Sequence, residues 1–206
     1  MSLITVQQAL ARIYTDSKLR DEFLTNPDVV GRTLKLNCVE IQQLSNLSSQ
    51  EVNMYASSLK YKRLGEIRKL LPLTVKVLGN KLNELFFQYA ETYLPSKQNK
   101  HLQDAMQLCR FILNTNIQPE WTLDIVNYEY MQLQTINTKK LIFAGCFNYP
   151  IHTLIHSLDA DFAPKPKPKA NLTIWFRFTP RHKLHSLTIP LINIESIKKF
   201  TIDLPI

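Results

Sequence analysis

The sequence comprises 206 residues, of which 45% are hydrophobic and 20% are charged. This apolar fraction excludes an intrinsically disordered chain, and four glycines are too few for a fibrous protein. No stretch of about 18 uncharged apolar residues occurs, which argues against a membrane-spanning helix. Lysine and arginine exceed the acidic residues by 25 to 17, and the net charge of +8 favours an acidic partner: nucleic acid, an anionic membrane surface, or an acidic protein or peptide.

The three cysteines predict no covalent framework. Cys38, Cys109 and Cys146 lie far apart and are odd in number, which argues against a set of disulfides and against a CxxC metal site. Each lies among apolar residues, so we expect three small buried side chains. The first residues lack the basic segment and long apolar run of a secretory signal. A reducing, cytoplasmic location is therefore expected.

The first two thirds of the chain predict helices. Apolar residues recur there at helical spacing, and Pro27, Pro72, Pro95 and Pro119 mark the points where helices begin or end. The strongest pattern begins at a capping-box-like serine near residue 48 and continues to Pro72. The expected helices cover residues 17–25, 28–34, 38–47, 49–71, 73–93, 102–114 and 120–134.

The pattern changes near residue 135. Residues 140–144 are consistent with a short strand or with the end of a buried helix, and residues 150–158 favour one more short helix. The alternating Pro and Lys of residues 163–169 predict a stiff, exposed connector. After it the apolar period falls to 2, which predicts strands over residues 172–178, 184–190 and 197–204.

The sequence therefore predicts an α+β fold, with an N-terminal helical bundle of about seven helices and a small C-terminal three-stranded antiparallel sheet. The expected divisions are a bundle over residues 1–162, the connector over 163–169, and a β-sheet peptide-docking region over 170–206. In the first strand, Leu172, Ile174, Phe176 and Phe178 share one face, while Thr173, Trp175 and Arg177 share the other. So small a sheet needs the bundle or a partner to cover its apolar face.

Motifs of known catalytic or cofactor sites are missing from the sequence: it contains no P-loop, GxGxxG, HExxH, GxSxG or CxxC. His152 and His156 are spaced i,i+4, and Cys146 with Asp159 or Asp161 would complete a metal site. The alternative is that both are ordinary surface or half-buried histidines on a short helix and bind no metal. His182 and His185 flank a predicted turn and are expected to be solvated. We predict no catalytic and no metal-binding residues in this chain.

The most concentrated positive charge lies in residues 60–69. Three interpretations remain open: a helix that contacts phosphates of nucleic acid, the solvated face of an amphipathic helix, or a surface that docks onto an acidic protein. The residues involved are Lys60, Lys62, Arg63, Arg68 and Lys69.

An open sheet edge carries unpaired N–H and C=O groups, which can bind an extended peptide as an added strand. Basic residues nearby would favour an acidic peptide, although the same lysines can instead protect an edge from pairing. The candidate peptide-binding residues are Arg177, Lys198, Lys199, Phe200, Thr201 and Ile202.

Two segments resemble a known bacterial family. They are YTDSKLRDEFLTNPD, residues 14–28, and YASSLKYKRLGEIRKLLPLT, residues 55–74. The family comprises partner subunits that accompany multinuclear non-haem iron oxidases acting on ribosomally made peptides. The order of a helical bundle and a small sheet is most similar to the partner subunits of methanobactin biosynthesis. The motif resemblance covers roughly residues 12–80, and beyond them it is architectural.

This resemblance implies a heterodimer with an iron-containing, TIM-barrel-like oxidase subunit. Such a complex uses molecular oxygen to convert cysteines of a precursor peptide into oxazolone and thioamide groups, on the way to a copper-binding product. The present chain would not be a catalyst by itself and would hold no cofactor, since the iron belongs to the oxidase. It would bind the precursor's leader and dock onto the oxidase, with no nucleic-acid or membrane partner. The alternative is a basic, helical nucleic-acid-binding protein.

Overall fold

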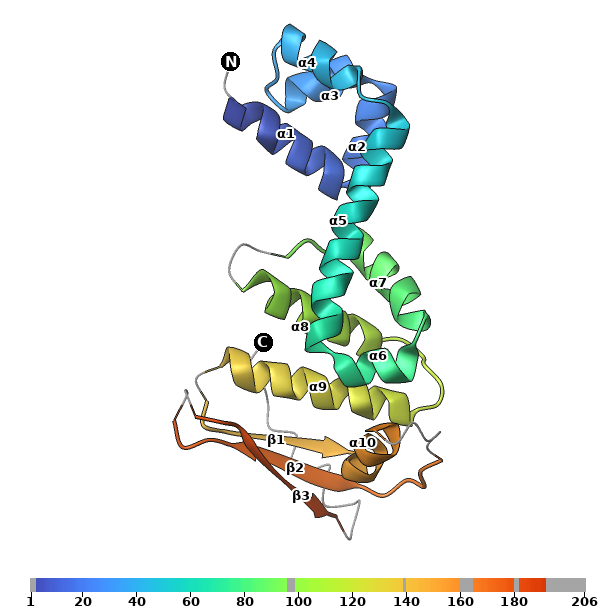
Figure 1. The fold of residues 1–206 in the computed structure, drawn as a ribbon, viewed down its shortest axis with the longest axis vertical. Coiled ribbons are helices and arrows are strands. Elements are labelled where there is room, and N and C mark those ends of the chain that lie inside the picture. Colours follow the sequence, from blue (N-terminus) through green and yellow to red (C-terminus); the bar gives the residue numbers. More distant parts are fainter. Residues whose placement is uncertain (1–2, 96–98, 139, 160–164, 180–181, 192–206) are drawn as a thin grey trace. The chain divides into compact units, whose positions relative to one another are not determined.

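The computed structural model describes residues 3–95, 99–138, 140–159, 165–179 and 182–191 (Figure 1). Within these residues it is mostly helical, with a three-stranded antiparallel sheet in the C-terminal part. This confirms the expected α+β class. Contacts divide the chain into two compact units: unit 1 comprises residues 1–66 and 86–95, and unit 2 comprises residues 67–85 and 96–206.

The described residues form ten helices, more than the seven or so expected. They are α1 (Leu3–Thr15), α2 (Ser17–Thr25), α3 (Pro27–Thr33), α4 (Cys38–Ser45), α5 (Ser49–Leu70), α6 (Pro72–Leu78), α7 (Lys81–Thr92), α8 (Lys100–Leu113), α9 (Trp121–Asn137) and α10 (Ile151–Asp159).

Three differences explain the higher count: α10 corresponds to the short helix expected over residues 150–158 outside the bundle's seven, and two further helices were not expected. No element was expected over α1, although its Ala9 and Ile13 are buried. The single helix expected over residues 73–93 is divided into α6 and α7 at Gly79, whose φ of 52° lies in the left-handed region. Only glycine adopts this region without a steric cost, so Gly79 ends α6 and re-aims the chain.

Unit 1 has its own core, to which α1 to α4 and the first part of α5 contribute. Side-chain caps fix three of the helix starts: Asp16 accepts a hydrogen bond from the Leu19 N–H, and capping boxes are formed by Asn37 with Glu40 and by Ser48 with Glu51. A Cβ added at Gly31 would lie 2.5 Å from Ile41 Cγ1, so α3 and α4 approach closely there. The core consists of Ala9, Ile13, Phe23, Val30, Leu34, Leu36, Ile41, Leu44 and Val52.

Unit 2 contains the sheet, formed by β1 (Ile142–Phe147), β2 (Asn171–Phe176) and β3 (His185–Pro190) in the order β1-β2-β3. Both pairings are antiparallel, with Ile174 opposite Ala144 on β1 and opposite Leu187 on β3. One face of the sheet packs on α9 and α10 (Figure 1). The core between these layers consists of Ile125, Tyr128, Phe147, Ile151, Leu154, Leu158 and Trp175.

The two faces of β2 have opposite environments. Trp175 is 1% exposed and packs on the helices, together with buried Thr173. Because side chains alternate along a strand, Leu172, Ile174 and Phe176 lie on the other face. That face is accessible to solvent, since Ile142 on β1 is 69% exposed and Leu187 on β3 is 54% exposed. The helices therefore cover the Trp175 face, and the aliphatic face stays open.

Residues 140–144, which the sequence left open between a strand and the end of a helix, lead into and form part of the strand β1. Residues 197–204, expected to form the third strand, lie outside the described residues. The strand that completes the described sheet is β1, which precedes the Pro/Lys connector and the expected boundary at residue 162. The described part of the connector has exposed lysines, and its Lys169 N–H donates to the Asn148 carbonyl.

Candidate functional site

Among the described residues, β3 is an edge strand with no further strand paired to it, and one hydrogen bond shows which of its main-chain groups face outward. The Leu191 N–H donates to the Ala170 carbonyl at 2.9 Å, and the strand register places these two residues opposite each other. In an antiparallel pair, residues alternate between facing their partner strand and facing away from it. The main-chain groups of Ile189, Leu187 and His185 therefore point to β2. Those of Ser186 and Thr188 point away from it and offer two N–H and two C=O groups to a further strand.

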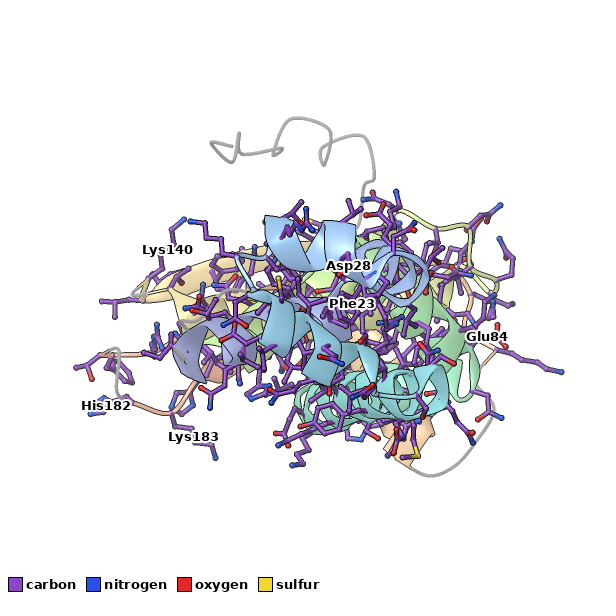
Figure 2. All side chains as sticks on the ribbon, turned by 90° about the horizontal axis from the view of Figure 1, so that it is seen from above. Phe23, Asp28, Glu84, Lys140, His182 and Lys183 are labelled. Atoms are coloured by element: carbon purple, nitrogen blue, oxygen red, sulfur yellow. The ribbon has the colours of Figure 1, made fainter. Side chains whose placement is uncertain are left out.

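Pro190 limits this edge at one end. Its main chain points away from β2, like the main chain of Ser186 and Thr188, but a proline nitrogen carries no hydrogen to donate. At the other end, His182 and Lys183 follow β2 and project from the turn before β3 (Figure 2). The open donors therefore lie between a basic turn and a proline stop. We call the main chain of residues 184–189 the β3 edge.

Inward-facing side chains hold this edge strand on the sheet. The Thr188 hydroxyl lies 2.8 Å from the Thr173 hydroxyl on β2. Burial raises the pKa of the Tyr128 phenol, and hydrogen bonds, including one with Ser186, act in the opposite direction. These side-chain contacts add to the main-chain ladder with β2, while within the described residues no further strand pairs with the outward main-chain groups of β3.

Of the expected peptide-binding residues, only Arg177 lies in the part of the chain that the structure describes. Lys198, Lys199, Phe200, Thr201 and Ile202 lie outside the described residues. The Arg177 guanidinium donates to the carbonyls of Thr138 and Lys140, at 2.5 Å and 3.1 Å. Arg177 therefore secures the chain before β1, at the side of the sheet opposite the β3 edge.

The basic segment of α5 is partly engaged within the protein. In unit 1, Lys60 forms an ion pair with Glu91, and the Arg63 guanidinium donates to the Tyr93 carbonyl while lying over the Phe86 ring. The hydrogen bond from Lys60 lowers the pKa of the Glu91 carboxyl, and Ser17 adds to this effect.

The remaining basic residues of the segment are exposed. In unit 2, Arg68 donates to the Asn83 side chain at 2.6 Å, and Lys69 is exposed. Lys62, in unit 1, is exposed as well. A continuous phosphate-binding face is therefore not favoured, because Lys60, Arg63 and Arg68 already have partners.

Lys62 lies beside exposed apolar side chains that the sequence analysis did not single out. Met54 is 65% exposed and Tyr61 is 60% exposed, and the Tyr61 ring contacts Phe87 edge-on at 5.2 Å. Methionine and tyrosine are enriched in protein interfaces, whereas a solvated helix face is mostly polar. The spacing of residues 54, 58, 61 and 62 along one helix face is the signal that could have revealed this surface.

The proposed metal ligands do not come together. Cys146 alternates with the buried Phe147 and therefore lies on the open face of the sheet, whereas α10, which carries His152 and His156, packs on the other face. Asp161 lies outside the described residues. Among the residues that the structure describes, no three His, Cys, Asp or Glu side chains form a group suited to a metal ion.

The cysteine prediction was correct for one residue of three. Cys109 is buried, and burial raises the pKa of its thiol. Cys38 and Cys146 are exposed, because they lie at the start of α4 and on the open face of β1. His182 and His185 are exposed as expected, and the His185 ring stacks on Phe176 at 5.6 Å.

Comparison with models of protein families and with the sequences of curated proteins finds no match to this chain. In the described part of the chain, no helix combines the length and the apolar character needed to cross a bilayer.

Proposed function

We propose that this chain is the non-catalytic partner subunit of an iron-dependent peptide oxidase. It binds the leader of a ribosomally made precursor peptide and docks onto the oxidase, which converts cysteines of that peptide into oxazolone and thioamide groups. The product class suggested by the sequence resemblance is a methanobactin-like copper chelator. Leader binding away from the reacting cysteine would supply the energy that positions this cysteine at the iron site.

The observation that carries this proposal is the β3 edge. Its two outward N–H and two outward C=O groups match the main chain of an extended peptide, whatever the peptide's side chains. Lys183 at one end and the lysines of the connector add positive charge, so an acidic leader would be favoured over a basic one.

Replacing Ser186 by proline tests the edge directly. Proline removes an N–H that points away from β2 and therefore leaves the β2–β3 ladder complete. We expect leader affinity to fall about tenfold, which corresponds to one main-chain hydrogen bond and the disturbed geometry around it. The measurement is a titration of the full chain with the leader of the precursor encoded beside the oxidase, by fluorescence anisotropy.

Ser186→Ala is the matched control. It removes the hydroxyl that acts on Tyr128 but retains the N–H, so leader affinity should stay within about twofold of the wild type, a difference below 0.5 kcal/mol. Equal losses of leader affinity in the two variants would show that the Ser186 hydroxyl is responsible and not the Ser186 N–H. Unchanged binding in Ser186→Pro would show that the leader does not pair with β3.

Oxidase docking is proposed for the surface formed by Met54, Tyr61 and Lys62. Lys62→Glu should weaken the complex by a factor of about 2 to 5, the range expected for one exposed ion pair, with most of the change in the association rate. Lys18→Glu, on exposed Lys18 of α2, makes the same change of charge elsewhere in unit 1. Biolayer interferometry at two salt concentrations compares the variants. Equal effects would assign the change to net charge and would exclude this surface.

Co-expression with the oxidase tests the assembly as a whole. Size exclusion should give a one-to-one complex, with iron present in the oxidase and in the complex but not in the isolated chain. Metal bound by the isolated chain would contradict the proposal. Steep, salt-dependent binding to DNA or RNA without any oxidase complex would favour the nucleic-acid alternative instead.

A further inference from the structure

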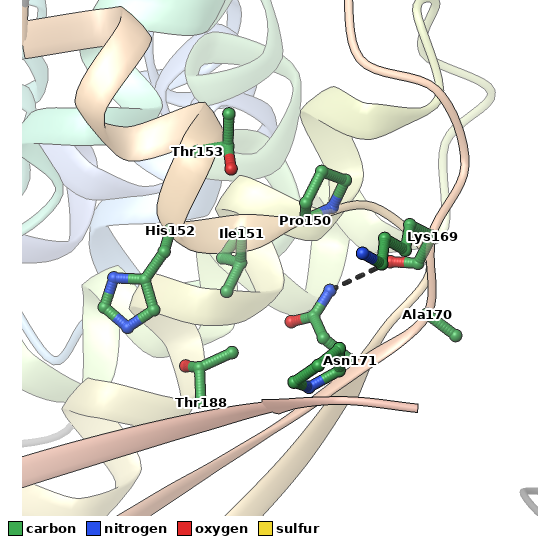
Figure 3. A pocket seen from close by; sticks show the side chains of 9 residues that line it. Pro150, Ile151, His152, Thr153, Lys169, Ala170, Asn171 and Thr188 are labelled. Carbon is green, nitrogen blue, oxygen red and sulfur yellow. Dashed lines mark hydrogen bonds between the residues drawn. The ribbon is translucent and has the colours of Figure 1, made fainter. Parts of the chain in front are cut away.

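A shallow hollow of about 190 Å³ lies in unit 2, where the first turn of α10 faces the start of β2 and the end of β3 (Figure 3). Its wall includes Ile151, His152 and Thr153 from α10, together with Asn171, Thr188 and Pro190 from the sheet. Thr188 and Pro190 also border the β3 edge, so a strand added there would pass the mouth of the hollow.

Asn171 places an unpaired acceptor in this hollow. The residue is 4% exposed, and its Nδ2 donates to the carbonyls of Tyr149 and Lys169, at 2.5 Å and 3.2 Å. These bonds fix the amide orientation, because the reverse orientation would bring Oδ1 against two carbonyl oxygens. The buried Oδ1 has no partner among the described residues and points into the hollow (Figure 3). A buried acceptor without a donor is costly, so this position is suited to an incoming donor.

The opposite wall presents donors. α10 is nine residues long, and its first internal hydrogen bond runs from the Leu154 N–H to the Pro150 carbonyl. The N–H groups of Ile151, His152 and Thr153 therefore have no acceptor within the helix. The positive end of the helix dipole coincides with them, and Lys169 on the rim adds a further positive charge.

These groups select the chemistry of the ligand. A carboxylate would suit the helix end but would place a negative oxygen against Asn171 Oδ1. A cation would suit Oδ1 but would meet the helix dipole and Lys169. A neutral group that donates on one side and accepts on the other satisfies both walls. We propose that the hollow binds an amide group, whose N–H donates to Asn171 Oδ1 and whose oxygen accepts from the first turn of α10.

In the leader complex, the natural source of this amide is an Asn or Gln side chain. Alternate residues of an added strand project to the α10 face of the sheet, and one of them would lie beside Thr188, next to the hollow. This part of the inference rests on the proposed function. It makes the leader's selectivity depend on a carboxamide at one position in addition to main-chain pairing.

Propionamide, which corresponds to a glutamine side chain, tests the hollow without any peptide. The full chain is titrated while ¹H–¹⁵N spectra report the amides of His152, Thr153 and the Asn171 side chain. We expect saturable shifts, with propionate binding about tenfold more weakly because it lacks the donated hydrogen bond. Equal or tighter binding of propionate would overturn the assignment. Shifts that do not saturate would also overturn the assignment, because they would show that propionamide has no specific site in the hollow.

Two histidine variants supply a matched pair. His152→Glu places a carboxylate in the first turn of α10, where it stabilises the helix end and competes for its free N–H groups. His156→Glu makes the same change one turn later, at an exposed position outside the hollow. Propionamide affinity should fall about tenfold in His152→Glu, the equivalent of one hydrogen bond, and remain unchanged in His156→Glu. Equal affinity in the two variants would overturn the site.

The result is separable from the proposed function. Propionamide does not need the β3 edge, so its binding would establish the hollow even if leader binding survives in Ser186→Pro. Conversely, a leader that requires Ser186 but binds equally well after its Asn and Gln residues are changed to Leu would support the edge and overturn the role of the hollow in leader binding.

Discussion

Trp175→Ala should lower the free energy of unfolding by about 3 to 5 kcal/mol, the usual loss for a large aromatic residue removed from a core. The Trp175 ring contacts Tyr128 at 5.4 Å and Phe147 at 6.2 Å between ring centroids, and it is 1% exposed. It therefore joins α9, β1 and β2 in one cluster. Urea denaturation followed by circular dichroism measures the loss.

Phe176→Ala is the matched control, because Phe176 is the next residue on the same strand and lies on the open face. It should cost about 1 kcal/mol or less, since little apolar area is returned to water there. A loss equal to that of Trp175→Ala would show that both faces of the sheet are covered, and would contradict the assignment of the faces.

Glu129→Ala should lower the free energy of unfolding by about 3 kcal/mol, because one buried and one partly buried N–H group lose their acceptor. Glu129, on α9, is 3% exposed and accepts hydrogen bonds from the N–H groups of Leu73 and Thr74, at 2.8 Å and 2.7 Å. It thus caps α6, which has no capping side chain of its own. Glu129→Gln retains one acceptor oxygen and should give an intermediate loss. Equal stability of the alanine variant and the wild type would contradict the capping role.

The pH dependence provides a second test of Glu129. Burial raises the pKa of its carboxyl, and the hydrogen bonds from residues 73 and 74 only partly oppose this. The folded state then holds this proton more tightly than the unfolded state does. The contribution of Glu129 to the free energy of unfolding therefore falls as the pH rises from about 4.3, the ordinary glutamate value, through the raised folded-state pKa. Glu129→Gln should remove this slope, while the slope from Asp124, whose pKa burial also raises, should remain.

The sequence predicted the helices and strands for which a single pattern, such as a proline or a regular apolar spacing, was clear. Helix starts and ends at Pro27 and Pro72 were found because proline cannot continue a helix, and the alternation of residues 172–178 and 184–190 located β2 and β3. β1 was left ambiguous, because a short apolar run has no period that separates a strand from a buried helix. Alternation also cannot say which face of β2 is covered, since Trp175 and the aliphatic residues are both apolar.

The candidate site was harder to predict, because it consists largely of main-chain groups. The outward N–H and C=O of Ser186 and Thr188 depend on strand order and hydrogen-bond parity, and neither can be read from residue types. The same holds for Asn171, whose unpaired oxygen results from two carbonyls that fix its nitrogen. The charges of residues 60–69 were visible in the sequence, but their partners Glu91, Tyr93 and Asn83 were not.

The position of β1 before the Pro/Lys connector limits how the protein can be divided into fragments. Because the first strand lies before the Pro/Lys connector, a fragment beginning at residue 163 would retain only β2 and β3 of the described strands, without the α9 and α10 side chains that surround Trp175. Such a hairpin would be marginal in water. A fragment that retains the described sheet with its helical cover must therefore begin at or before residue 121, the first residue of α9. α9, the sheet and α10 should accordingly be kept together as one block in any truncated form of the protein.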